Sequence, residues 1–224
     1  MALADTLTAV GTAVLARCGA RPLGSHLFPV WPGAVFAAAA LPVHCVPGDN
    51  LAIHVAVAQA PPGSVLVVDA AGDPEYGYVD EILAVAARMR DVAGIVVDGC
   101  VRDVGAIART ELPVISAGVS VREPGHDAGG AVGREVLMNR GQAPTPVRRG
   151  DWVVADEDGA VCLPRGRVTA IVADAVQSVS RDQEVLDALC TGKSTIDLLN
   201  LDASRVAGWE GETVGAGRSA ERAG

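Results

Sequence analysis

The stretch Gly94-Ile95-Val96-Val97-Asp98-Gly99-Cys100-Val101-Arg102-Asp103 decides the fold that we expect for this chain. Its apolar start predicts a buried strand, which Asp-Gly ends before an arginine and an aspartate arrive side by side. Open α/β sheets bind their ligands in a crevice at the carboxyl ends of parallel strands. Arg102 and Asp103 are therefore the first candidates for a functional site. The alternative is that Asp103 only caps a short helix over 104–109 while Arg102 lies in solvent.

The segments on either side of this stretch predict an α/β fold with a parallel-rich central sheet. Further strands are expected over 34–44, 65–68 and 113–119, and a helix is expected over 50–59. A second helix, after a turn over 70–78, carries a predicted buried face of Val79, Ile82, Leu83, Ala86 and Met89. Strands and helices that alternate with short connections predict right-handed crossovers between parallel strands.

The remaining segments predict one domain over residues 1–202. One helix is expected over 3–18, a hairpin over 152–163 and a long amphipathic helix over 165–189. Residues 203–224 are rich in Gly, Ala, Ser and charge, so we expect a disordered tail.

Composition excludes several classes of function. A formal net charge of -9 would repel a phosphate backbone, so direct nucleic-acid binding is not expected. The five cysteines are widely spaced with no Cys-x-x-Cys, which is typical of reduced thiols in the cytoplasm. The start lacks the pattern of a signal peptide, and no apolar run is long enough to span a bilayer. We expect a cytoplasmic protein.

The Arg102-Asp103 pair indicates a chemistry. One carboxylate beside a fixed guanidinium suits a weakly held Mg²⁺ or Mn²⁺ ion, with Asp103 as the ligand and water and substrate completing the site. The metal would polarise a 2-keto acid while Arg102 stabilises the developing enolate, which gives carbon-carbon bond cleavage without a Schiff base. The only lysine, Lys193, is far away in the sequence.

A Gly-rich loop over 122–133 holds His126 and is expected to be flexible enough to close over a site. His126 is a candidate proton carrier or substrate contact, although an exposed histidine without a role is the alternative. His44 and His54 are expected in structural positions, and Asp69 and Asp98 as turn formers.

Several motifs in this order resemble one known family. They are Pro47-Gly48-Asp49-Asn50, Pro62-Gly63-Ser64-Val65-Leu66-Val67-Val68-Asp69, the central stretch, and Arg149-Gly150-Asp151-Trp152-Val153-Val154-Ala155-Asp156-Glu157-Asp158-Gly159. Together they resemble the family that joins regulator of ribonuclease activity A (RraA) to the 4-hydroxy-4-methyl-2-oxoglutarate aldolases. The resemblance implies a single compact swivelling β/β/α-type domain, assembled as a homotrimer or homohexamer with active sites between subunits. It also implies Mg²⁺ or Mn²⁺ on Asp103, Arg102 against a pyruvate enolate, and oxaloacetate decarboxylation.

The chain departs from the family pattern after Asp69. Active members carry a Trp-Gly-Glu-like segment whose backbone amides hold the pyruvate carboxylate, and the aligned residues here are Val79, Asp80 and Glu81. Asp80 brings a negative charge and a Cβ to a place where an anion should approach closely. Asp80 and Glu81 thus become candidate catalytic residues, with Asp80 also a possible extra metal ligand. A candidate substrate wall is formed by Tyr76, Tyr78, Val79 and Ile82.

Three functions remain open at this point. The leading one is a metal-dependent lyase of the aldolase or decarboxylase type acting on a 2-keto acid or related β-hydroxy carbonyl compound. The second is a non-catalytic regulator that docks on a partner enzyme. The third keeps the metal site but catalyses a dehydration or isomerisation in a biosynthetic pathway.

Overall fold

The computed structural model describes residues 2–139 and 143–208. The chain divides into two compact units, Met1–Val179 and Ser180–Gly224. The described part of the second unit holds the end of α6 (Val168–Cys190), α7 (Thr195–Leu198) and the short 3₁₀ helix η2 (Ala203–Arg205). Of the tail predicted over 203–224, residues 209–224 lie outside the described residues. The first unit contains the sheet and every candidate site residue.

Within the described residues, nine strands form one mixed sheet in the order β1-β11-β10-β3-β4-β5-β6-β2, with β7 paired to β3. The four central strands are parallel, as the sequence predicted, and the flanking pairs are antiparallel. The bounds are β1 (Arg21–Pro22), β2 (Phe28–Pro29), β3 (Phe36–Cys45), β4 (Ser64–Val79), β5 (Gly94–Val101), β6 (Val114–Val119), β7 (Gly130–Val132), β10 (Trp152–Asp156) and β11 (Gly159–Leu163).

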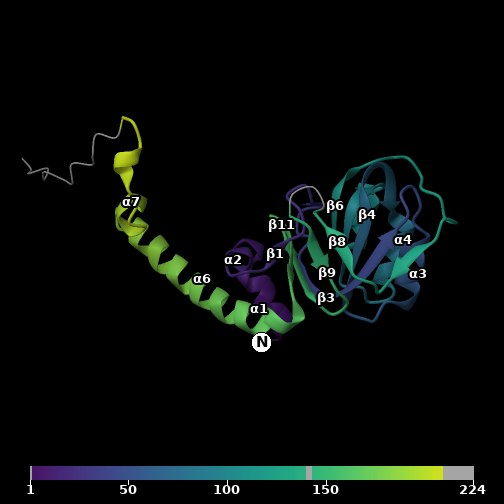
Figure 1. Ribbon diagram of the computed structural model, residues 1–224, viewed down its shortest axis with the longest axis horizontal. Coiled ribbons are helices and arrows are strands. Elements are labelled where there is room, and N and C mark those ends of the chain that lie inside the picture. The colour runs from purple at the N-terminus through teal and green to yellow at the C-terminus, as the bar shows by residue number, and fades with distance from the viewer. Residues whose placement is uncertain (1, 140–142, 209–224) are drawn as a thin grey trace, which may run out of the picture. The chain divides into compact units, whose positions relative to one another are not determined.

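The crossover helices α3 (Leu51–Gln59), α4 (Glu81–Arg88) and α5 (Val104–Thr110) pack on one face of this sheet. Their buried side chains, including Ile53 and Leu83, meet Leu66 and other strand residues. A small sheet of β8 (Val136–Met138) and β9 (Thr145–Val147) covers the opposite face (Figure 1). These three layers confirm the predicted β/β/α architecture.

A third core lies where α1 (Leu3–Val10), α2 (Thr12–Arg17) and the first turns of α6 pack on β10 and β11. The single helix predicted over 3–18 is wrong, because Gly11 interrupts it at φ 82°. The Thr12 N–H and hydroxyl donate to the Asp156 carboxylate instead of continuing the first helix. The predicted hairpin is confirmed as β10 and β11, and the long helix follows the 3₁₀ turn η1 (Arg165–Arg167).

The segment after Asp69 differs from the prediction, because β4 continues through it to Val79. Asp69 pairs with Asp98 and Val79 with Val101, so ten residue steps of β4 lie beside three of β5, with register shifts between them. Val79 is thus a strand residue, and α4 starts only at Glu81. The buried face of α4 consists of Leu83, Ala84 and Ala87. The predicted burial of Ile82 and Met89 is therefore wrong, since these residues are 72% and 78% exposed.

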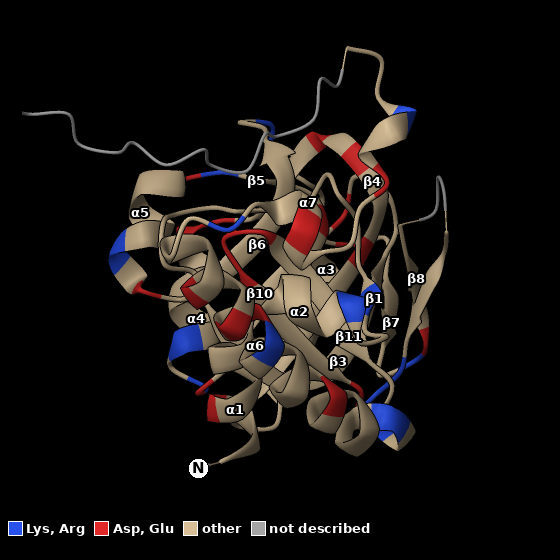
Figure 2. Ribbon diagram, turned by 90° about the vertical axis from the view of Figure 1, so that its left-hand side faces the viewer, with Lys and Arg blue, Asp and Glu red and all other residues tan. Residues whose placement is uncertain are grey.

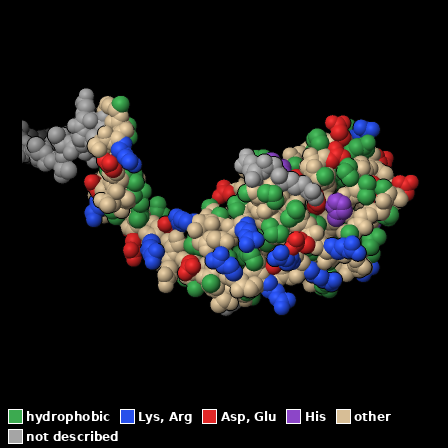
Figure 3. Space-filling model, in the orientation of Figure 1, with side chains coloured by type: hydrophobic (Ala, Val, Ile, Leu, Met, Phe, Trp, Pro, Cys, Tyr) green, Lys and Arg blue, Asp and Glu red, His purple; other side chains and the backbone are tan. Residues whose placement is uncertain are grey.

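Charged residues are distributed over many elements of the chain (Figure 2). On the face shown in Figure 3, basic and acidic side chains lie among hydrophobic ones. One ion pair of the described residues joins Arg148 to Glu135. No helix in the described ranges is long and apolar enough to cross a membrane.

Candidate active site

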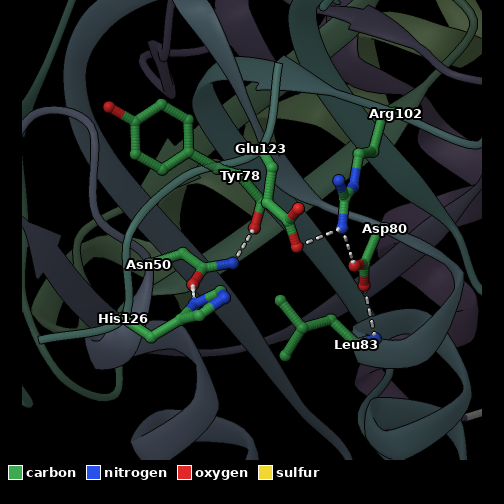
Figure 4. A network of polar contacts seen from close by, with 7 residues as sticks. All are labelled: Asn50, Tyr78, Asp80, Leu83, Arg102, Glu123 and His126. Carbon is green, nitrogen blue, oxygen red and sulfur yellow. Dashed lines mark hydrogen bonds and ion pairs between the residues drawn. The ribbon is translucent and has the colours of Figure 1, made fainter. Parts of the chain in front are cut away.

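The candidate site lies where the parallel strands β4, β5 and β6 end (Figure 4). Strand β4 leads to Asp80, β5 leads to Arg102 and Asp103, and the loop after β6 supplies two further side chains. The sequence predicted this convergence from the topology of parallel strands. The network that Figure 4 shows consists of Asn50, Tyr78, Asp80, Leu83, Arg102, Glu123 and His126.

Arg102 is held by two carboxylates. Its Nη2 donates to Asp80 Oδ2 at 2.9 Å and to Glu123 Oε1 at 3.4 Å. The hydrogen bond that Arg102 donates to Asp80 raises the pKa of Arg102, although partial burial opposes this. Its Nε is buried and, among the described residues, has no hydrogen-bond partner. The alternative that Arg102 lies in solvent is wrong, since only 22% of its side chain is exposed.

Asp80 has two partners that fix its carboxylate. It is the N-cap of α4, where its Oδ1 accepts from the Leu83 N–H at 2.9 Å, and its Oδ2 accepts from Arg102. Burial disfavours ionisation of Asp80, but the hydrogen bonds from Leu83 and Arg102 outweigh it and lower the pKa. Asp80 therefore lies in the site as a fixed negative charge, with 13% of its side chain exposed.

Asp103 presents a carboxylate that the protein does not use for capping. It occupies the N-cap position of α5, yet its side chain makes no cap hydrogen bond, so the alternative reading of a capping side chain is wrong. Its backbone is left-handed at φ 58°, a conformation that costs a non-glycine residue about 1 kcal/mol. Such strain often occurs at functional sites. The exposed carboxylate is available to a cation.

A divalent cation would be held only weakly at this site. The described residues contain no group of three or more His, Cys, Asp or Glu side chains that could hold a metal ion. Mg²⁺ often binds through one or two carboxylates and keeps several waters. A cation at this site would therefore rest on Asp103, water and substrate. Glu81, which the sequence also made a candidate catalytic residue, is exposed in the first turn of α4.

His126 is oriented by Asn50. The Asn50 amide donates to the Tyr78 carbonyl at 3.0 Å, so its oxygen faces His126 Nδ1, 2.7 Å away. Because that oxygen only accepts, Nδ1 carries the proton in this hydrogen bond, and Nε2 of the neutral tautomer is an acceptor with no hydrogen bond to the described residues. The His54 ring stands edge-on to His126, with centroids 5.5 Å apart. Burial and the neighbouring His126 lower the pKa of His54.

The loop that carries Glu123 and His126 is anchored to the start of α3, although we expected it to be flexible. Asp49 is buried, and its carboxylate accepts from the N–H groups of Leu51 at 2.9 Å, Asp127 at 2.6 Å and Ala128 at 2.9 Å. Burial opposes ionisation, but these three bonds lower the pKa of Asp49. A fixed charge thus positions the loop beside the site.

The predicted substrate wall is only partly present. Tyr78 and Val79 are completely buried, which argues against side-chain contact with a substrate. The Tyr78 hydroxyl donates to Asp73 at 2.7 Å and accepts from the Gly48 N–H at 2.7 Å. Tyr76 is partly exposed beneath the Arg122 guanidinium, 4.3 Å from the ring centroid. Tyr76 and the exposed Ile82 remain candidates for substrate contact.

Asp69 and Asp98, which were expected as turn formers, each also contact a histidine. Both are buried, and they lie side by side in register on β4 and β5. Asp69 contacts His44 at 3.2 Å, and Asp98 contacts His26 at 2.8 Å. Asp69 also accepts from the Ala71 N–H, which confirms the predicted turn chemistry.

Sequence reasoning missed Glu123, Asn50 and His54 as members of the site. Glu123 lies only three residues before His126, in the loop already singled out, so its charge was an available signal. Asn50 lies at the N-cap position of α3, yet its side chain makes no cap bond and orients His126 instead. His54 had apolar neighbours in sequence and gave no signal.

The fold and the site define a three-layer α/β protein with an arginine and two carboxylates at the carboxyl ends of its parallel strands. The chain belongs to the RraA-like family (Aldolase/RraA), which it matches over residues 3–162.

Three relatives show how far the likeness extends. A protein of Halalkalibacterium halodurans with the provisional name 4-hydroxy-4-methyl-2-oxoglutarate aldolase is 29% identical over 141 residues, which cover 63% of this chain and 65% of that protein. The structure of Streptomyces coelicolor RraAS2, described as an unusual member of the RNase ES inhibitor RraA family, has 25% identity and a TM-score of 0.68 over 82% of this chain and 94% of that one. An uncharacterized Pseudomonas syringae protein shares the fold, with 21% identity and a TM-score of 0.78 over 89% of this chain and 93% of that one.

Proposed function

We propose that the protein is a divalent-metal-dependent carbon-carbon lyase, of the aldolase or oxaloacetate-decarboxylase type, that acts through an enolate on a 2-keto acid or related β-hydroxy carbonyl compound. The observation that carries this proposal is that Arg102, fixed by Asp80, is followed directly by Asp103, whose exposed carboxylate makes no cap hydrogen bond and acts on Arg102 as a neighbouring negative charge. The provisional aldolase names of the relatives support it.

Each residue has a role in this chemistry. Asp103 would hold Mg²⁺ or Mn²⁺, which would polarise the substrate carbonyl. Arg102 donates to the oxygen that gains negative charge when the carbon-carbon bond breaks. His126 Nε2, the acceptor of the neutral tautomer, can take the proton of a substrate hydroxyl and return it to the enolate carbon. Glu123 and Asp80 fix the guanidinium so that little reorganisation is needed.

The assembly that we propose is a homotrimer or homohexamer in which neighbouring subunits complete the site. Helix α4 supports this, because Ile82, Val85 and Met89 leave a row of exposed apolar side chains next to Asp80. Such a row is usually covered by a partner. Size-exclusion chromatography with light scattering would test it, and a monomer at micromolar concentration would contradict it.

The lyase proposal is tested by assaying a panel of 2-keto acids for released pyruvate, with and without Mg²⁺ or Mn²⁺. Asp103→Asn should abolish metal-stimulated turnover, because the amide does not replace the charge that attracts the cation. Asp174→Asn, which removes an exposed carboxylate from α6, is the matched control and should behave like the wild type. Full activity in EDTA would refute the proposal.

A second candidate is a non-catalytic docking protein, and the position of Asp80 favours it. The Asp80 carboxylate accepts hydrogen bonds from the Leu83 N–H and from Arg102, which are the donors that a substrate carboxylate would need. A thermal-shift titration with Mg²⁺ or Mn²⁺, alone and with oxalate, separates the candidates. The docking protein should respond to neither, while a dehydratase or isomerase on the same metal site should respond to the metal yet release no pyruvate.

A further inference from the structure

The N-terminus of α4 and Arg102 together form a set of donors for a carboxylate. The Leu83 N–H is one of the donors in the first turn of α4 that have no partner within the helix, and the guanidinium adds a positive charge. Helix N-termini and guanidinium groups are the donors that proteins commonly use for anionic ligands. Here both point at one carboxylate, and that carboxylate is the chain's own Asp80.

This internal carboxylate changes what the site can accept. Asp80 is tethered beside its donors, so it has a high effective concentration there and an external anion must displace it. An anion that approaches without displacing Asp80 finds the positive charge of Arg102 already neutralised by the Asp80 carboxylate. The unpaired Nε of Arg102 does not compensate, because it is buried.

We infer that Asp80 is a specificity-determining residue that takes the place of a substrate carboxylate. The preferred substrate then presents an uncharged group next to its reactive carbonyl. A hydroxy ketone or an amide suits this place, because its O–H or N–H can donate to the acceptor positions of the Asp80 carboxylate that Leu83 and Arg102 do not use. The inference rests on the proposed lyase function and, of the two substrate classes named for it, favours uncharged β-hydroxy carbonyl compounds over 2-keto acids.

The test measures oxalate binding by isothermal titration calorimetry in the presence of Mg²⁺, for the wild type, Asp80→Gly and Asp80→Asn. Asp80→Gly frees both donors and should bind oxalate about tenfold more tightly or better, the change expected when one charge-assisted hydrogen bond becomes available. Asp80→Asn keeps the side-chain volume and cap chemistry but removes the charge, so it should fall between the two. Glu75→Gln, which removes a nearby exposed carboxylate, controls for net charge and should match the wild type.

A parallel assay compares each 2-keto acid with its amide. The wild type should prefer the amide, and Asp80→Gly should reverse that preference. Equal oxalate affinity in the wild type and Asp80→Gly, or no oxalate binding by any variant, would overturn the inference. If Asp80→Gly fails to fold, Asp80→Asn decides the question. Failure of the lyase proposal shows separately, as turnover that Asp103→Asn and EDTA leave unchanged.

Discussion

Replacing Asp49 with asparagine is expected to release the loop that carries Glu123 and His126. The Asp49 carboxylate is buried and accepts three backbone N–H bonds, one from α3 and two from the loop. Asparagine keeps one acceptor oxygen and turns a donating amide toward the remaining N–H groups. One or two of the three bonds are therefore lost, and a donor faces another donor.

The magnitude follows from the number of bonds. A hydrogen bond to a charged group contributes about 1.5–3 kcal/mol, so the loss of one or two predicts a decrease of about 2–5 kcal/mol in the free energy of unfolding. Asp127→Asn makes the same chemical change one loop position after His126, where the side chain is exposed, and should cost less than about 0.5 kcal/mol.

Urea denaturation and amide hydrogen exchange measure these effects. In Asp49→Asn, the Asp127 and Ala128 amides should exchange faster, while those of β5 should change only with global stability. The folded-state pKa of Asp49 is lowered, so its contribution is present above the unfolded value and is lost as pH falls through the folded one. The difference between wild type and variant should shrink in acid. Unchanged exchange at both loop amides would refute the reasoning.

Two further substitutions test the site. His126→Ala should slow aldol cleavage by about 10²-fold or more but slow oxaloacetate decarboxylation less, because only aldol cleavage removes a hydroxyl proton. Added imidazole should restore part of the rate. Equal losses of rate on both substrates would contradict the role of Nε2. Gly77→Ala should destabilise the protein by about 1–3 kcal/mol and lower turnover, because its Cβ would lie 2.6 Å from the Ser120 carbonyl oxygen and 2.9 Å from Arg102 Cβ. Urea denaturation and the pyruvate assay measure both effects, and wild-type stability would show that the backbone relaxes freely.

Much of the fold could be predicted because local signals and topology agree. Strand β5 combines an apolar run with an Asp-Gly stop, and the alternation with helices fixes the parallel centre of the sheet. The same rule placed Arg102 and Asp80 at one edge. Gly11 was harder to read, because a helical spacing of apolar residues continues across it and only Asp156, far away in sequence, supplies the bonds that redirect the chain.

The rest of the site depended on pairings that a sequence does not contain. Nothing local shows that Asn50 will meet the Tyr78 carbonyl and thereby select the tautomer of His126. The pairing of Asp80 with Arg102 likewise depends on the register of β4 and β5, which sets Val79 opposite Val101. The phase of α4 was misread because Val79 is apolar and fits either a strand end or a helix start.

The unequal lengths of β4 and β5 between their paired ends have an evolutionary consequence. The extra residues of β4 lie outside the regular pairing of the two strands, whereas β5 covers the same span in three residue steps. Mutations at its exposed positions, Ala71, Gly72, Pro74 and Glu75, can remodel ligand preference, while the buried Tyr78 and the tightly packed Gly77 keep the excursion joined to the core. Members of one lineage could therefore diverge in chemistry through this segment alone.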